Sequence, residues 1–205
     1  DAPTLEVSLG EGEHHGGGLG STTFTVTNVD NVSAGYNNSY GYYILDDNGN
    51  PTQGQVIWTN VKETPGATFT FTLEGVDPDK VGFFLIPDGD RKNPNVPDGE
   101  PVTFVQDANG RWAAVDSDGH TLTGQGAPAF FSTQALNPDG FDHETDVNWI
   151  GNQNWEDLLG GGDHDYNDAN FNVSHVETPG TGGGFTTFPL DINTALTDTD
   201  GSETL

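Results

Sequence analysis

The sequence contains no cysteine, and this absence excludes two common ways of stabilising a small domain. Neither disulfide bonds nor thiolate metal sites can form. Stability must then come from the core, from size, or from hard cations bound to oxygen ligands. Methionine is also absent, and there is no signal peptide and no long apolar run. We therefore expect a fragment of a longer protein, without direct membrane insertion.

Basic residues are scarce: 5 Lys and Arg stand against 32 Asp and Glu, for a formal net charge of -27. Nucleic acid and anionic membranes are poor partners for such a chain, because both are bound through Lys and Arg surfaces. A compact state this acidic repels itself unless cations offset the charge. The acidic residues are mostly Asp, which suits tight turns and calcium chelation. We expect several bound Ca2+ ions.

Strand signals dominate the chain, and helix signals are few. Short runs rich in Val, Ile, Thr, Phe and Tyr alternate with clusters of Gly, Asn, Asp and Pro, a pattern typical of antiparallel sandwiches and barrels. We predict an all-β fold, a calcium-stabilised antiparallel β-sandwich with long loops. The predicted strands are Thr22–Asn28, Tyr40–Leu45, Gln55–Thr59, Thr68–Leu73, Val81–Ile86, Val102–Gln106, Trp112–Val115 and Ala169–Val176.

Local signals add two hairpins, a short helix and a boundary. Asn-Gly pairs at 48–49 and 109–110 predict hairpin turns, because Asn-Gly supplies the positive φ angles of primed turns. Asn154–Leu159 has the pattern of one or two helical turns. A Gly-rich stretch begins near residue 180. We expect a ligand-binding domain at 1–179, then a linker and the start of a further repeat at 180–205, although Phe185–Leu190 could instead add a last strand to the domain.

The sharpest local feature is the acidic segment Gly160–Asp168. Asp163, Asp165 and Asn167 occupy alternate positions of a D-x-[DN]-x-[DN] loop, which gathers side-chain oxygens around one hard cation. An EF-hand would continue with Gly and later Glu, but this sequence has Asp168 and Ser174. The loop must therefore obtain further ligands from elsewhere in the chain.

Those further ligands could come from two Pro-Asp-Gly segments. Asp88 and Asp90 follow the strand that ends at Ile86, and Asp139 and Asp142 lie in a second such segment. Loops at strand ends converge in space, so both segments could supply oxygens to the metal. Ordinary β-turns are an equally good interpretation of each one.

A bound ligand could contact three further residues. Trp155 and Tyr166 accompany the acidic segment, and Arg91 is one of the few basic side chains beside Asp88 and Asp90. Aromatic residues that flank a metal loop more often belong to the core. Enzyme signals are poor, because the chain lacks a Cys nucleophile, a G-x-S-x-G elbow and an H-E-x-x-H pair. We expect no catalytic activity.

Two sequence blocks carry a family resemblance. Gly151–Asp157 followed by Gly162–Asp168 resembles the DUF4114-type domain, and Val81–Gly89 is similar to the other common block of that family. The resemblance spans roughly residues 1–177, and Ala195–Leu205 resembles the opening of extender domains in long RTX adhesins. The chain thus resembles the peptide-binding domains of such adhesins.

The resemblance implies an extracellular module on a bacterial cell surface. Its fold would be a calcium-bound β-sandwich that holds the C-terminal residues of proteins on other cells, with a calcium ion meeting the terminal carboxylate. The resemblance also implies that Asp163, Asp165 and Asp168 are calcium ligands. Adjacent domains of the same adhesin would be its other partners, and cell adhesion and biofilm formation its setting. The residues also leave open a calcium-dependent lectin, in which sugar hydroxyls meet the same ion, and a structural spacer whose calcium is fully buried.

Overall fold

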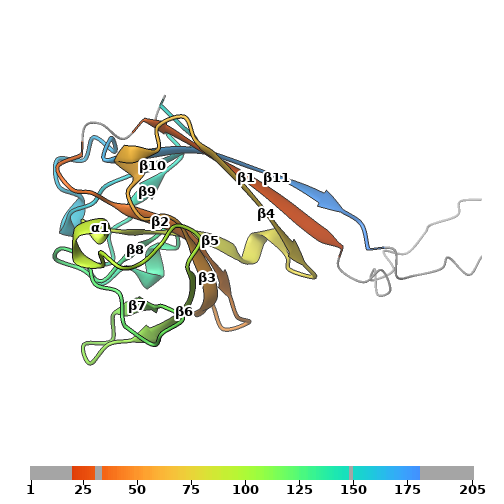
Figure 1. The fold of residues 1–205 in the computed structure, drawn as a ribbon, viewed down its shortest axis with the longest axis horizontal. Helices are drawn as coiled ribbons and strands as arrows, with labels where there is room; N and C mark the ends of the chain where they lie inside the picture. The colour runs from red at the N-terminus through yellow and green to blue at the C-terminus, as the bar shows by residue number, and fades with distance from the viewer. Residues whose placement is uncertain (1–19, 31–33, 148–149, 181–205) are drawn as a thin grey trace, which may run out of the picture.

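The computed structural model describes residues 20–30, 34–147 and 150–180, and nearly all regular structure in these ranges is β-strand (Figure 1). The predicted all-β fold is confirmed. The strands are β1 (Ser21–Asp30), β2 (Ser39–Leu45), β3 (Pro51–Trp58), β4 (Thr68–Glu74), β5 (Val81–Ile86), β6 (Pro101–Gln106), β7 (Trp112–Val115), β8 (Phe130–Phe131), β9 (Glu144–Thr145), β10 (Gln153–Trp155) and β11 (Ala169–Thr178).

These strands form two antiparallel sheets. The five-stranded sheet has the order β4-β1-β11-β10-β9, and the six-stranded sheet has the order β7-β6-β3-β2-β5-β8. In the five-stranded sheet, β1, β4 and β11 run together away from the rest of the molecule (Figure 1). The predicted hairpin turns join β2 to β3 and β6 to β7, with positive φ at Gly49 and Gly110.

The main core lies between the two sheets. Tyr40 of the six-stranded sheet stacks on Phe171 of the five-stranded sheet, with ring centroids 3.7 Å apart. Phe24, Phe71 and Trp155 also belong to this core. Period-two alternation explains the packing, since in β4 it turns Phe71 inward and Thr70 and Thr72 to solvent.

A second core covers the opposite face of the six-stranded sheet. Phe84, Phe104 and Phe131 form its centre, and their rings meet at steep or tilted angles. Loop residues such as Leu122 and Leu136 close it from outside. The six-stranded sheet is therefore apolar on both faces, which explains the continuous burial of residues 82–86 in β5.

The structure differs from the sequence prediction in its helices. The helix predicted over Asn154–Leu159 is wrong, because residues 153–155 form β10 and only a short 3-10 turn follows at Leu159–Gly161. The one α-helical turn of the described chain is α1 (Gly89–Lys92).

The domain boundary near residue 180 stays a prediction, because residues 181–205 lie outside the described ranges. No helix within those ranges is both long and apolar enough to span a membrane.

Candidate metal centre

The pairing of β10 with β11 brings the acidic segments together. Trp155 in β10 lies opposite Ala169 in β11, so the residues that follow β10 and those that precede β11 are neighbours. The backbone N–H of Asp168 donates to the carbonyl of Trp155 at 3.2 Å. The chain between these positions is therefore a closed loop that begins and ends at one place.

Three carboxylates gather on this loop. One oxygen from each of Glu156, Asp163 and Asp165 lies within 4.8 Å of the others, and this is the one group of three or more such ligand residues in the described chain. Glu156 is 0% exposed, whereas Asp163 and Asp165 are exposed. The group therefore has a buried floor and an outer side open to solvent.

The Glu156 carboxylate is only half satisfied. Its Oε1 accepts a hydrogen bond from the Tyr166 backbone N–H at 2.6 Å, but its buried Oε2 has no hydrogen-bond partner. Burial raises the pKa of Glu156, and the charges of Asp163 and Asp165 raise it further, against the lowering effect of the Tyr166 hydrogen bond. Leaving a buried charged oxygen unpaired is costly. A cation among the three carboxylates would remove that cost.

The donor set is that of a hard cation. All three side chains offer carboxylate oxygens, the ligands that Ca2+ takes in proteins. They would hold the ion from one side, and no thiolate is available in this chain to favour a softer metal. The residues present therefore fit calcium.

The glycines and turns of the loop create this geometry. His164 and Tyr166 have positive φ angles of 61° and 54°, so the backbone reverses repeatedly around Asp165. Gly161 has φ 80°, and a Cβ there would lie 2.3 Å from the Phe141 ring. Only glycine fits this position, because both the conformation and the contact exclude a side chain.

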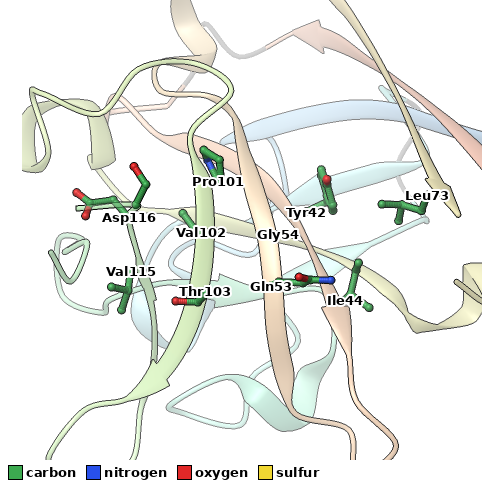
Figure 2. A pocket seen from close by; sticks show the side chains of 11 residues that line it. Tyr42, Ile44, Gln53, Gly54, Leu73, Pro101, Val102, Thr103, Val115 and Asp116 are labelled. Carbon is green, nitrogen blue, oxygen red and sulfur yellow. The ribbon is translucent and has the colours of Figure 1, made fainter. Parts of the chain in front are cut away.

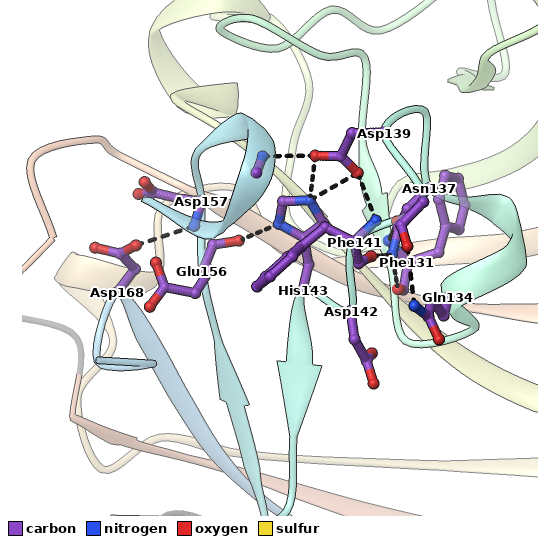
Figure 3. Close-up of polar contacts among 12 residues, drawn as sticks. Phe131, Gln134, Asn137, Asp139, Phe141, Asp142, His143, Glu156, Asp157 and Asp168 are labelled. Carbon is purple, nitrogen blue, oxygen red and sulfur yellow. Dashed lines mark hydrogen bonds and ion pairs between the residues drawn. The ribbon is translucent and has the colours of Figure 1, made fainter. Parts of the chain in front are cut away.

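A buried histidine fixes the loop from below (Figure 3). His143 is 0% exposed, and its Nδ1 lies 3.0 Å from the Glu156 carbonyl oxygen. Its Nε2 lies 3.0 Å from Asp139 Oδ2, which also accepts the Gly160 N–H at 2.7 Å. Asp139 is partly buried, which tends to raise its pKa, yet the hydrogen bonds from Gly160, Phe141 and His143 hold it below its usual value.

Asp139 is therefore tied to His143 and to backbone, and it does not join the three-carboxylate group. Asp142 does not join it either. Its carboxylate is exposed and points away from the His143 network (Figure 3), while its carbonyl accepts the Tyr166 hydroxyl at 3.0 Å. The structure does not bring the side chains of Asp139 and Asp142 into the three-carboxylate group, and their role as metal ligands stays a prediction.

Asp168, which the family resemblance implies as a calcium ligand, lies outside the three-carboxylate group and forms a second acidic pair with Asp157. Its Oδ2 accepts the Asp157 N–H at 2.9 Å, and the Asp157 carboxylate accepts Asn38 Nδ2 at 2.8 Å. Burial, then the charge of Asp157, raises the pKa of Asp168 to about 7. Burial also raises the pKa of Asp157.

The Pro87–Asp90 segment is likewise a structural turn. Asp88 has φ 53°, and its Oδ1 accepts the Asn37 N–H and Arg91 Nη1, both at 3.1 Å. Asp90 Oδ2 accepts the side-chain amides of Asn37 and Asn60 at 3.2 Å. Neither Asp joins the three-carboxylate group, and their role as metal ligands stays a prediction. Arg91 is exposed, with Asp88 as its ion-pair partner.

The remaining predicted residues take different roles. Trp155 is 0% exposed within the main core, which favours the core interpretation over ligand contact. Tyr166 is partly exposed at the rim of the loop, and its ring stacks on Phe141 at 6.4 Å. Asn167 donates to Asp165 through its backbone N–H at 3.1 Å and its side-chain amide at 2.5 Å.

Glu156 is the functional residue that sequence reasoning missed as a ligand. It lies seven positions before Asp163 and outside the D-x-[DN]-x-[DN] spacing. The available signal was its place directly after Trp155 in the Gly151–Asp157 block. The erroneous helix assignment there hid the fact that Glu156 follows a strand which pairs with the far end of the loop.

Comparison with known proteins gives a partial identification. Residues 76–175 match the model of a family described as "Domain of unknown function (DUF4114)". No curated protein and no solved structure matches the chain. The matched segment includes β5 to β10, most of β11 and all three carboxylates of the candidate metal centre. The resemblance to the DUF4114 domain family is therefore supported over residues 76–175, the part of the chain that carries the candidate site.

Proposed function

We propose that the protein is a non-catalytic, calcium-dependent binding module of a bacterial surface adhesin, and that it holds C-terminal peptides of proteins on other cells. The observation that carries this proposal is the buried, unpartnered Oε2 of Glu156 beneath the exposed carboxylates of Asp163 and Asp165. The adhesin setting and the extracellular location rest on the resemblance of the sequence blocks.

The open side of the carboxylate group explains how an ion there can recognise a ligand. Ca2+ takes about six to eight oxygen ligands, whereas the group offers three side chains. Glu156 closes the inner side, and the exposed Asp163 and Asp165 leave the outer side to water or to a ligand. An incoming carboxylate can therefore replace water on the ion.

The negative charge of the chain limits where an anionic ligand can bind. With a formal net charge of -27, the protein repels an anionic ligand everywhere except beside bound cations and its few basic side chains. A chain terminus brings its carboxylate into a narrow site without a continuing backbone in the way. This geometry favours C-termini over internal acidic side chains.

The affinity expected for such a ligand is modest. A tetrapeptide has roughly 25 to 30 heavy atoms, and at about 0.3 kcal/mol per atom its binding free energy is near 8 kcal/mol, which corresponds to roughly micromolar affinity. Adhesion would then require many copies that bind together.

The test is calorimetry with tetrapeptides that carry either a free or an amidated C-terminus, in calcium and in EGTA. We expect binding only for the free C-terminus and only with calcium, and loss of binding in Asp163→Asn. Asp118→Asn is the matched control, because Asp118 is exposed in a hairpin turn away from the carboxylate group.

Three other results would replace the peptide proposal. Equal binding of free and amidated peptides would refute the carboxylate mechanism. Binding on a glycan array, without peptide binding, would establish a calcium-dependent lectin. Calcium binding with neither kind of ligand would indicate a structural spacer.

A further inference from the structure

The five-stranded sheet has an open edge at β4. This strand pairs with β1 and with no other described strand. Within the described ranges, the backbone of residues 68–74 makes no hydrogen bonds beyond those to β1. Edge strands often carry Pro, Lys or a bulge that prevents further pairing. β4 has neither Pro nor Lys, its register with β1 is unbroken, and its one charged residue is Glu74. The edge can therefore accept another strand.

The register between β1 and β4 shows which backbone groups are free. Antiparallel strands alternate between hydrogen-bonded and non-hydrogen-bonded pairs. The Asn28 N–H donates to the Ala67 carbonyl at 2.9 Å, and the Gly75 N–H donates to the Gly20 carbonyl at 2.8 Å. The alternation gives the same result from either end: every second residue of β4 bonds to β1, and the residues between direct their N–H and C=O groups away from it. The outward residues are Thr68, Thr70, Thr72 and Glu74.

The side chains of β4 agree with this alternation. Its three Thr residues lie opposite Thr residues of β1, and the paired hydroxyl oxygens are 2.9, 3.4 and 3.1 Å apart. Close side chains are typical of non-hydrogen-bonded pairs, because the two Cα atoms are nearer there. Phe69, Phe71 and Leu73 face the other way, toward the six-stranded sheet. The free backbone groups therefore belong to the residues whose side chains are exposed.

A groove of about 390 Å³ adjoins this edge (Figure 2). It exists because the five-stranded sheet ends at β4, while the six-stranded sheet continues through β3, β6 and β7. Leu73 of β4 forms one side, Tyr42 and Ile44 of β2 lie next to it, and Thr103 and Val115 of β6 and β7 lie farther across. The groove shares no residue with the three-carboxylate group. Inward side chains of a strand added to β4 would enter it.

The side of the groove that lies away from β4 is negatively charged (Figure 2). Asp116 lines it, and the hydrogen bond from the His120 backbone N–H is the main reason that the pKa of Asp116 lies below its usual value. Glu100 lies beside it, because its Oε1 accepts the N–H and the hydroxyl of the lining residue Ser117 at 2.8 and 2.6 Å. None of the lining residues is Lys or Arg. A cationic side chain is therefore complementary to this groove.

We propose that β4 and this groove form a second binding site, which takes an extended segment of another protein as an added antiparallel strand. The segment has aliphatic residues at alternate positions, a Lys or Arg in the same series, and polar residues between them. Its aliphatic and basic side chains enter the groove, and its polar side chains continue the exposed Thr surface of β4. The site needs neither calcium nor a free C-terminus. A second copy of this chain is a poor occupant, because it brings another formal charge of -27 to the interface.

Calorimetry with the full chain and a synthetic peptide tests the proposal. The peptide is acetyl-Lys-Thr-Val-Thr-Val-Thr-amide, in which Lys and both Val residues take the positions that face the groove. We expect it to bind, and we expect the same peptide with Glu in place of Lys to bind more weakly. Because its C-terminus is blocked, the peptide has no carboxylate for the proposed calcium site. Asp163→Asn should therefore bind it as the wild type does, so this proposal and the proposed function fail separately.

Changes to the backbone test the edge itself. Methylation of the three Thr nitrogens of the peptide removes the N–H groups that would face β4, whereas methylation of the Val nitrogens removes N–H groups that would point away. We expect the first change to weaken binding by at least about tenfold and the second to leave it within about twofold.

A matched pair of protein variants makes the same test from the other side. Thr70→Pro removes an outward N–H that β1 does not use, and Pro is tolerated at such edge positions. Thr70→Val keeps this N–H and loses the same hydroxyl. With both folds checked by thermal unfolding, Thr70→Pro should weaken peptide binding by at least about tenfold, and Thr70→Val should leave it unchanged.

Three results would overturn the proposal. Absence of binding, or equal weakening by the two methylation patterns, would show that β4 does not accept a strand. Equal binding of the Lys and Glu peptides would show that the partner is not selected by its positive charge. Dimers of the protein alone in sedimentation, lost in Thr70→Pro, would show that a second copy covers the edge instead.

Discussion

Removal of calcium should destabilise the protein through Glu156, and the substitution Glu156→Gln isolates this effect. The change keeps the size of the side chain and an oxygen that can accept the Tyr166 N–H. It removes a buried negative charge that lies beside Asp163 and Asp165. The variant should therefore bind calcium poorly while its fold remains intact.

The magnitude follows from mass action. One ion at a thousandfold excess over its dissociation constant adds about 4 kcal/mol to the free energy of unfolding. For a domain of this size, each kcal/mol shifts the melting temperature by about 2 to 4 °C. EGTA should therefore lower the melting temperature of the wild type by about 8 to 16 °C for this site alone.

The Glu156→Gln variant should lose this dependence of the melting temperature on calcium. Its melting temperature should change little between calcium and EGTA, beyond what any other ions contribute. In EGTA the variant should melt at or above the wild type, because it no longer buries a negative charge beside the carboxylates of Asp163 and Asp165.

Scanning calorimetry at pH 7.5 measures all of these values, with Asp118→Asn as the control for a lost surface charge. An unchanged wild-type melting temperature in EGTA would refute the reasoning. So would a Glu156→Gln variant that keeps the full calcium response.

Three further predictions follow from the same site and fold. Asp165→Ala should weaken calcium binding at least about tenfold in calorimetric titration, whereas Asp118→Ala should not, because only Asp165 belongs to the carboxylate group. In metal-free protein the pKa of Asp168, about 7, lies above its usual 3.8, so the fold holds this proton more tightly than the unfolded chain. The free energy of unfolding should therefore fall as pH rises from about 4 to about 7, and Asp168→Asn should flatten this dependence in urea titrations; an equal slope in both proteins would contradict the assignment. Truncation after Pro179 should leave a cooperative, calcium-binding unit, because β11 ends at Thr178; an insoluble product would assign later residues to the sandwich.

The longer strands could be predicted from sequence because their side chains decide their local structure. Thr68–Leu73 alternates with a period of two, and Val81–Ile86 is a short apolar run bounded by turn residues. The strands β8, β9 and β10 were not predictable in this way. They have two or three residues each, and they exist because long-range pairing holds them, as β11 holds β10.

In the candidate site, too, local sequence spacing predicted some ligands, whereas long-range strand pairing placed another. Asp163 and Asp165 could be identified because a chelating loop has a fixed spacing. Glu156 could not, because its contribution depends on the pairing of two strands that the sequence did not reveal. Asp88 and Asp139 follow Pro in turn sequences, and spacing alone does not tell a metal ligand from a side chain that accepts nearby hydrogen bonds.

We propose that an open calcium ion sits among Glu156, Asp163 and Asp165. A crystal structure of the protein grown with calcium, with anomalous data collected at long wavelength, tests it most directly. We predict an anomalous peak in contact with Glu156 Oε2 and with both Asp carboxylates, and at least one exchangeable water on its outer side. The absence of a peak there, or an ion whose ligands all come from the protein, would contradict the account.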